Sequence, residues 1–279
     1  MVSYTEIRTV PGCRLPIRSM GQPDLHDGAR MIYKDPSVYD LIYGGATADQ
    51  FASLCKVAAS CGAPPAGPWL ETACGTGRLL VPAAAAGIAV AGFDLELRMV
   101  EFARARLPAD AELRVADLTD CGGAFDGRTF PFAFTLVNTI RHLDSDDALL
   151  AHLSGMAALL APGGVYVVGL SLIRPGEDEI EEDVWRGSDG ERTVTEVSTA
   201  LPPAPGTRAE TIISHITIER AGAPPEHRDE SFPLRTYTQE EWETAIERSA
   251  LRVRAVFGIW GERATPFSGG YFLYALASR

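Results

Sequence analysis

Short apolar runs alternate with segments of helical apolar spacing through the middle of the chain. Apolar runs of this length are typical of buried strands, and recurrence at three and four residues is typical of helices. The predicted strands comprise residues 69–72, 89–93, 112–116, 132–137 and 165–170. The predicted helices comprise residues 78–86, 95–107 and 146–160. Strands and helices that alternate with short connections favour a doubly wound, mostly parallel sheet.

The pattern changes after residue 173. Residues 174–236 contain no long helical pattern, whereas 193–199 and 211–219 alternate between apolar and polar residues, with proline-rich turns between them. This pattern predicts an antiparallel β insertion. The acidic run 177–183 predicts a solvated loop.

The two ends of the chain complete this organisation. Thr238 and Glu241 have the spacing of a helix capping box, and two further predicted strands, 251–257 and 271–277, close the chain. Residues 1–30 have no sustained period, and residues 31–60 have helical spacing. We therefore predict three parts. They are an N-terminal arm with a helical lid (1–62), a sheet domain (63–173 with 237–279) and the insertion (174–236).

Composition and charge exclude several classes of protein. The chain has 25 Lys and Arg against 37 Asp and Glu, a formal net charge of −12, which disfavours nucleic-acid binding. The longest weakly polar stretch, 81–93, is too short and too broken by Pro82 to span a membrane. Five cysteines without a CxxC pattern suggest neither disulfides nor a zinc site, so a reducing cytoplasm is expected.

A glycine-rich turn, 71–78, follows the first predicted strand. Such a turn lets a ligand approach the backbone and points the N–H groups of the next helix toward it. The dinucleotide fingerprint G-x-G-x-x-G is not matched, because Ala73 and Arg78 occupy its first and third positions. The acid Glu71 at the mouth of the turn suits a ligand with an ammonium group or hydroxyls.

Five segments in order resemble the motifs of class I S-adenosylmethionine-dependent methyltransferases. They are Glu71–Arg78, Gly92–Met99, Val115–Leu118, Phe132–Leu143 and Leu160–Val167. The resemblance covers roughly residues 33–172 and, more weakly, 237–278. It implies S-adenosylmethionine as cofactor. It also implies a Rossmann-like doubly wound sheet of seven mostly parallel strands, with an antiparallel β insertion after strand 5 and an N-terminal helical lid.

The resemblance assigns roles to residues at the strand ends. Asp94 is expected to take the ribose hydroxyls, at about the spacing from the turn known for nucleotide folds, and Asp117 is expected to bind the adenine. Helix or turn capping is the alternative role for both acids. The full expected cofactor set is Tyr33, Tyr43, Glu71, Ala73, Gly75, Gly77, Asp94, Leu95, Met99, Ala116, Asp117, Leu118, Asn138 and Thr139.

His142 follows the fourth predicted strand, at the sheet edge where ligands of open sheets bind. A neutral imidazole there is a candidate general base, although packing or capping is equally compatible with its position and in-line transfer needs no base. Asp144, Asp146 and Asp147 fit a helix start better than a metal site, and Cys74 fits the turn better than a nucleophile. No metal is expected.

The acceptor is expected to be a small molecule, methylated on N, O or C, in secondary metabolism. The sequence looks most like natural-product and amino-sugar N-methyltransferases and glycine/sarcosine-type enzymes. The tyrosines of 33–43 are expected to cover the cofactor, with ordinary aromatic packing as the alternative. The expected acceptor contacts are Tyr39, Trp185, Arg192, His215, Arg235, Tyr237 and Trp260. A homodimer formed by exchange of the N-terminal arm stays open.

Three rival functions remain at this point. A nucleotide-dependent oxidoreductase is disfavoured by the mismatched fingerprint and by the lack of a Tyr-x-x-x-Lys pair. A non-catalytic member of the family would keep Glu71, Gly75, Gly77 and Asp94. A nucleic-acid methyltransferase is disfavoured by the net charge and by Val137–Ile140, which lacks the run that base methylation often uses.

Overall fold

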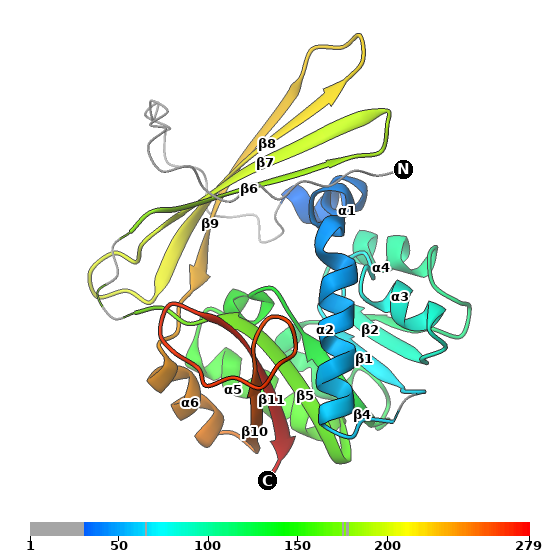
Figure 1. Ribbon diagram of the computed structural model, residues 1–279, viewed down its shortest axis with the longest axis vertical. Coiled ribbons are helices and arrows are strands. Elements are labelled where there is room, and N and C mark those ends of the chain that lie inside the picture. Colours follow the sequence, from blue (N-terminus) through cyan, green and yellow to red (C-terminus); the bar gives the residue numbers. More distant parts are fainter. Residues whose placement is uncertain (1–30, 65, 175, 177–178) are drawn as a thin grey trace. The chain divides into compact units, whose positions relative to one another are not determined.

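Two β-sheets with different strand patterns organise the chain (Figure 1). The computed structural model describes residues 31–64, 66–174, 176 and 179–279. Contacts divide the chain into two units. The small unit takes its described residues from Met1–Gly45 and Asp178–Leu234, and the large unit takes them from Ala46–Glu177 and Arg235–Arg279.

The large unit contains the seven-stranded sheet and most of the helices. Its strands are β1 (Trp69–Thr72), β2 (Val90–Asp94), β3 (Glu112–Val115), β4 (Phe130–Thr135), β5 (Leu160–Ser171), β10 (Leu251–Phe257) and β11 (Tyr271–Ser278). Its α-helices are α2 (Thr47–Ser60), α3 (Leu80–Ala85), α4 (Leu97–Arg104), α5 (Asp146–Leu159) and α6 (Gln239–Glu247). The 3₁₀ helices are η3 (Leu118–Gly123) and η4 (Thr139–His142), and η2 (Gly44–Ala46) spans the boundary between the units in sequence.

The strand order of the large sheet is β10-β11-β5-β4-β1-β2-β3. Strands β1 to β5 pair in parallel, whereas β11 runs antiparallel to its neighbours β5 and β10. The doubly wound, mostly parallel fold predicted from the sequence is therefore confirmed. The chain builds outward from β1 in both directions, so the strand order reverses between β1 and β4. Ligands of open sheets bind at such a point, beyond the carboxyl ends of the strands.

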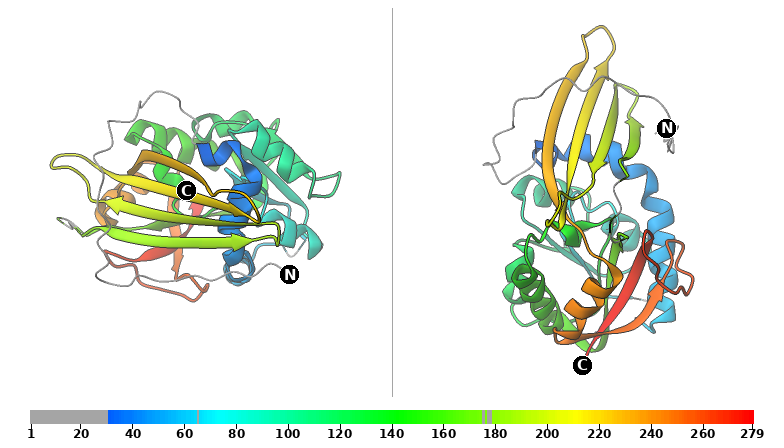
Figure 2. Two further views of the ribbon diagram at one scale, coloured as in Figure 1. Left: turned by 90° about the horizontal axis from the view of Figure 1, so that it is seen from above. Right: turned by 90° about the vertical axis from the view of Figure 1, so that its left-hand side faces the viewer.

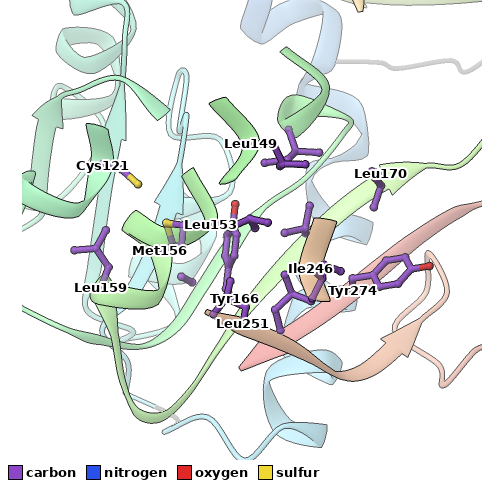
Figure 3. Close-up of a cluster of buried hydrophobic side chains, with 14 of the residues drawn as sticks. Cys121, Leu149, Leu153, Met156, Leu159, Tyr166, Leu170, Ile246, Leu251 and Tyr274 are labelled. Carbon is purple, nitrogen blue, oxygen red and sulfur yellow. The ribbon is translucent and has the colours of Figure 1, made fainter. Parts of the chain in front are cut away.

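Helices cover both faces of this sheet, which explains the continuous apolar runs of its central strands. On one face, side chains of α5 and α6 pack with alternate residues of β4 and β5, among them Tyr166 and Leu170 (Figure 3). On the other face, α2, α3 and α4 pack against residues such as Trp69, Phe132 and Val167. Because β1 is covered on both sides, its polar residues Glu71 and Thr72 are buried.

The small unit is a four-stranded sheet with helices on one face (Figure 2). Its elements are η1 (Met31–Lys34), α1 (Pro36–Tyr43), β6 (Glu181–Ser188), β7 (Arg192–Leu201), β8 (Ala209–Arg220) and β9 (Glu226–Arg235). Strands β6, β7 and β8 pair antiparallel, as the alternation predicted. Val38 and Leu41 of α1 pack against Val194 and Ile216, which point to the same face of the sheet.

Several sequence-based boundaries differ from the structure. Residues 181–183 of the acidic run begin β6 instead of lying wholly in a loop. Ser145, rather than an aspartate, caps α5 by accepting the N–H of Ala148, and Glu96 caps α4. Contacts place α2 with the large unit, whereas the sequence grouped it with the N-terminal lid. The expected arm, 1–30, lies outside the described residues.

Candidate functional site

The turn after β1 forms the floor of the candidate site, at the point where the strand order reverses. Ala73, Gly75 and Gly77 all adopt positive φ angles, of 50°, 53° and 70°. Glycine takes this conformation readily, whereas a residue with a Cβ is strained there. The left-handed Ala73 is therefore held in place by its surroundings, and such strain concentrates at functional sites.

Glu71 is buried at the mouth of this turn. Its side chain is 6% exposed, and its Oε2 atom has no hydrogen-bond partner. Burial raises the pKa of the Glu71 carboxyl to about 8, which Arg78 opposes and the charge of Asp94 reinforces. A buried carboxyl with an unfilled acceptor suits a cationic group of a ligand, because a buried polar atom without a partner is unfavourable. The ammonium group of S-adenosylmethionine fits this requirement.

Asp94 ends β2, beside the turn. Its Oδ2 accepts the N–H of Gly75 at 2.8 Å, and its Oδ1 accepts the N–H of Glu96 at 2.9 Å. Burial raises the pKa of Asp94, although these backbone donors stabilise the charged form. A carboxylate oxygen has room for more than one donor, so the fixed Asp94 can still accept two ribose hydroxyls.

The next residues supply apolar surface and a second acid. Leu95 is 61% exposed, as expected for a side chain that covers a ligand ring, whereas Met99 is 1% exposed within α4 and has a packing role. Asp117 follows β3 and caps η3, because its Oδ1 accepts from the N–H and the hydroxyl of Thr119 at 2.7 and 2.6 Å. Asp117 therefore caps η3, and its expected contact with the adenine stays a prediction. Ala116 and Leu118 beside it are partly buried.

The chain is strained again where β4 ends. Val137 and Asn138 have φ angles of 55° and 62°, and a β-branched residue is rare in this region. Tyr271 accepts the N–H of Val137 at 2.9 Å, and the Asn138 side chain accepts the N–H of Ser171 at 2.7 Å. Thr139 donates its hydroxyl to the Leu136 carbonyl at 2.8 Å. The strained Val137 and Asn138 therefore direct the chain into η4, on which His142 is exposed.

The expected acceptor residues of the large unit have mixed surroundings. Arg235 donates to the Asp144 carbonyl at 2.7 Å and to Asp146 Oδ1 at 2.6 Å, so it fastens the start of α5. Tyr237 is fully buried and packs edge-on against Trp242. Trp260 is 57% exposed between β10 and β11.

The other expected residues lie in the small unit. The rings of Tyr33, Tyr39, Tyr43 and Trp185 form a chain of neighbours with centroid distances of 4.7 to 5.8 Å. The Tyr43 hydroxyl donates to the buried Glu196 at 2.6 Å. The tyrosine rings therefore pack against one another and against Trp185 within the small unit.

Two more expected contacts lie on the strands of this sheet. His215 is exposed, and its Nδ1 lies 2.7 Å from Asp229 Oδ1. Arg192 pairs with Asp189, with Nε at 3.0 Å from Oδ2. Both side chains therefore have partners within the small unit.

Sequence reasoning missed the cation of the site. Arg78 was noted only as a mismatch to the dinucleotide fingerprint, yet it is buried and its charge acts on Glu71 and Tyr271. Its place directly after the second glycine of the turn was the available signal. Among the described residues, no group of three His, Cys, Asp or Glu side chains is placed to hold a metal ion.

The arrangement brings together an acid for an ammonium group, an acid for paired hydroxyls and an exposed apolar side chain at one sheet edge. These groups fit the methionine, ribose and adenine parts of S-adenosylmethionine. No described helix is long and apolar enough to cross a membrane.

Comparisons with known proteins agree with this geometry. The Methyltransferase domain family matches residues 70–164. A dTDP-3-amino-3,4,6-trideoxy-alpha-D-glucopyranose N,N-dimethyltransferase from Streptomyces venezuelae is 32% identical over 225 residues, which cover 79% of this chain and 91% of the relative. The crystal structure of Streptomyces venezuelae DesVI superposes with a TM-score of 0.68 at 30% identity, covering 85% of this chain and 96% of that one.

A second solved structure supports the fold. CalS10, an amino pentose methyltransferase from Micromonospora echinaspora solved with S-adenosylmethionine bound, has a TM-score of 0.66 at 23% identity and covers 86% of this chain and 97% of its own. Together with the site, these matches exclude the oxidoreductase alternative. The chain belongs to the S-adenosylmethionine-dependent methyltransferases that act on small molecules.

Proposed function

We propose that the protein transfers methyl groups to the amino group of a nucleotide-linked deoxyamino sugar. The observation that carries this proposal is the 32% identity, over 91% of its length, to a relative named as an N,N-dimethyltransferase of a dTDP-linked 3-amino sugar. The fold and the cofactor site are compatible with any nucleophile. The choice of nitrogen over oxygen or carbon therefore rests on the relatives.

S-adenosylmethionine, when bound, supplies a methyl group activated by its sulfonium. The acceptor amine attacks through its lone pair, so it must first be neutral. We propose that His142, exposed on η4 beyond the carboxyl end of β4, takes the proton that the nitrogen loses. Holding the amine in line with the methyl group supplies much of the rate enhancement.

The remaining roles are part of the same proposal. Tyr39, Trp185, His215, Arg235 and Trp260 stay the candidate acceptor contacts that the sequence predicted, whereas the fully buried Tyr237 packs in the core. Tyr33 and Tyr43 stay the candidate residues for covering the methionine end of the cofactor. The domain roles follow the sequence-based division into arm and lid, cofactor domain and insertion.

We also propose that the protein works in the cytoplasm without a nucleic-acid partner, and that a homodimer is compatible with it. The formal net charge of −12 supports the absence of a nucleic-acid partner, because it repels phosphate backbones.

A matched pair of acceptors tests the proposal. Purified protein is incubated with S-adenosylmethionine and either a dTDP-3-amino-deoxyglucose or the same sugar with a hydroxyl at that carbon, and the products are weighed by mass spectrometry. We expect one or two added methyl groups on the amino sugar alone, with one S-adenosylhomocysteine formed per methyl. Methylation of the hydroxyl sugar at a similar rate, or of neither sugar, would contradict the choice of acceptor.

His142→Gln tests the base with the same amino sugar. We expect kcat to fall by roughly a hundredfold, since general bases contribute about that much or more. An unchanged kcat would assign proton removal to solvent. Calorimetry with S-adenosylhomocysteine is the control, because the loss of a base leaves cofactor affinity unchanged.

A further inference from the structure

Two consecutive residues with left-handed backbone lead from β4 into η4. Val137 and Asn138 have φ angles of 55° and 62°. A β-branched residue such as Val137 is strained in this conformation, so the surrounding structure must hold it there. Because η4 begins at Thr139, directly after Asn138, the backbone angles of these two residues decide where η4 and its His142 point.

Hydrogen bonds from β5 hold Asn138. Its N–H donates to the Gly169 carbonyl at 3.1 Å. Its Oδ1 accepts the N–H of Ser171 at 2.7 Å, and its Nδ2 donates to the Ser171 hydroxyl at 3.2 Å. Asn138 is therefore fastened to the neighbouring strand through both its backbone and its side chain.

A side chain from a more distant strand holds Val137. The Tyr271 hydroxyl accepts the Val137 N–H at 2.9 Å. Tyr271 begins β11, which is separated from β4 by β5, so its side chain crosses β5 to reach the end of β4 (Figure 1). Burial raises the pKa of Tyr271 to about 12, although the Val137 N–H and the charge of Arg78 oppose the rise. The hydroxyl therefore stays neutral near pH 7, and the hydrogen bond does not depend on pH there.

The lack of a side chain at Gly169 makes this crossing possible. An added Cβ at Gly169 would overlap the Tyr271 hydroxyl and would lie 2.9 Å from Cζ of the ring. Such an overlap forces the packed groups apart. A side chain at position 169 would therefore push the Tyr271 hydroxyl away from Val137.

We propose that Tyr271 is a positioning residue for methyl transfer, whose hydroxyl holds the strained Val137 and thereby orients η4 and His142 for the reaction. The inference rests on the proposed function, in which His142 takes the proton from the acceptor nitrogen. Misplacing a reacting group by about 1 Å can lower a rate by about a hundredfold, so one hydrogen bond at this point can affect kcat. The alternative is that the hydroxyl contributes to stability alone.

Tyr271→Phe removes the hydroxyl and keeps the ring. We expect kcat with the dTDP-linked amino sugar to fall by roughly tenfold to a hundredfold, because His142 is no longer held in place. The affinity for S-adenosylhomocysteine, measured by calorimetry, should stay within about twofold of the wild-type value. Tyr274→Phe is the matched control, since Tyr274 lies on the same strand and its hydroxyl has no hydrogen-bond partner among the described residues. It should leave both quantities unchanged.

A double variant shows whether Tyr271 acts through His142. If it does, adding Tyr271→Phe to His142→Gln lowers kcat no further, within about twofold, because the base that Tyr271 orients is already absent. Two independent losses would multiply instead.

Gly169→Ala tests the same contact from the other side. It keeps the tyrosine but displaces its hydroxyl, so we expect a fall in kcat of the same order as in Tyr271→Phe. Gly123→Ala is the control for the added methyl group, because nothing lies within 4 Å of a Cβ at that exposed position.

The inference is overturned if Tyr271→Phe leaves kcat unchanged, if it weakens S-adenosylhomocysteine as much as it lowers kcat, or if its loss multiplies with that of His142→Gln. If Tyr271→Phe does not fold, an unchanged kcat in Gly169→Ala overturns it as well. A failure of the proposed function appears in other proteins. The wild type then methylates no amino sugar, or His142→Gln alone leaves kcat unchanged, and the inference fails with it.

Discussion

At the scale of single residues, buried polar groups distinguish the site from the surrounding core. At the turn after β1, Glu71 Oε2 is buried without a hydrogen-bond partner. His152 and Tyr166, by contrast, are buried with hydrogen-bond partners. His152 Nδ1 lies 2.9 Å from the Leu118 carbonyl, and Nε2 lies 2.8 Å from the Tyr166 hydroxyl. The Glu71 carboxyl therefore lacks a partner within the protein, whereas the hydrogen bonds of His152 and Tyr166 stabilise the folded chain.

The pH dependence of stability tests the burial of Glu71. Folding raises its pKa from the ordinary 4.5 to about 8, with Arg78 opposing the rise and Asp94 adding to it. Between these values the folded state binds the proton and the unfolded state does not, so stability falls as pH rises. We therefore expect the free energy of unfolding of the wild type, relative to that of Glu71→Gln, to fall by about 1.4 kcal/mol for each unit of rising pH.

Urea unfolding of cofactor-free protein at about pH 5.5, 6.5 and 7.5 measures this difference. Glu101→Gln is the control, because Glu101 is exposed on α4 and its carboxyl is hydrated in both states. A difference for Glu71→Gln that does not change with pH would show that Glu71 ionises normally in the folded protein.

The hydroxyl of Tyr166 gives a second test. A carbonyl accepts only, so His152 carries its proton on Nδ1, and Nε2 accepts from Tyr166. Burial lowers the pKa of His152 to about 4, which keeps the ring neutral. Tyr166→Phe leaves a buried acceptor without a donor and should lower the free energy of unfolding by about 1–3 kcal/mol.

Tyr274→Phe is the matched control for that variant. Tyr274 is also fully buried, but its hydroxyl has no hydrogen-bond partner among the described residues. Removing it should leave stability unchanged or slightly higher. Equal losses in the two variants, measured by urea unfolding, would contradict the hydrogen bond to His152.

At the scale of elements, turns and caps place the site residues, because they decide where each strand stops. The turn between β1 and α3 needs Gly77 for two reasons. Its φ is +70°, and an added Cβ would lie 3.0 Å from the Cβ of Ala103 on α4. Gly87, in the turn after α3, has a φ of +81° but nothing within 4 Å of the added atom.

These two glycines allow backbone strain and close packing to be separated. Each change to alanine should lower the free energy of unfolding by about 1 kcal/mol or more, because a Cβ is unfavourable in the left-handed backbone conformation. Gly77→Ala should lose at least about 1 kcal/mol more, because it also pushes α4 from the turn. Urea unfolding measures both losses, and a Gly77→Ala loss no larger than that of Gly87→Ala would show that α4 does not pack tightly there.

Sequence patterns predicted the elements that are buried on defined faces. The central strands β7 and β8 alternate cleanly and were recognised, whereas the edge strands β6 and β9 were not. Edge strands carry charged residues that oppose further pairing, so the acidic start of β6 resembled a loop. The same reason of context hid Arg78, because its burial and the effect of its charge on Glu71 depend on the folded structure. Met99 and Tyr237 were predicted from position alone and are packed in the core.

At the scale of the whole molecule, the chain joins a cofactor-binding sheet to a smaller antiparallel sheet. The large unit repeats the methyltransferase fold, with β1 at its centre and acids at the ends of β1 and β2. The small unit is inserted after β5 and takes α1 from the N-terminal side.

Calorimetric titration with S-adenosylhomocysteine, on wild type and on Asp94→Ala, tests the central claim most directly, with NADH as the competing ligand. The account predicts that S-adenosylhomocysteine binds the wild-type protein and that Asp94→Ala weakens it by roughly tenfold to a hundredfold, because one or two hydrogen bonds to a charged group are lost. NADH should bind neither protein. Equal affinity of the two proteins for S-adenosylhomocysteine, or binding of NADH alone, would contradict the cofactor site described above.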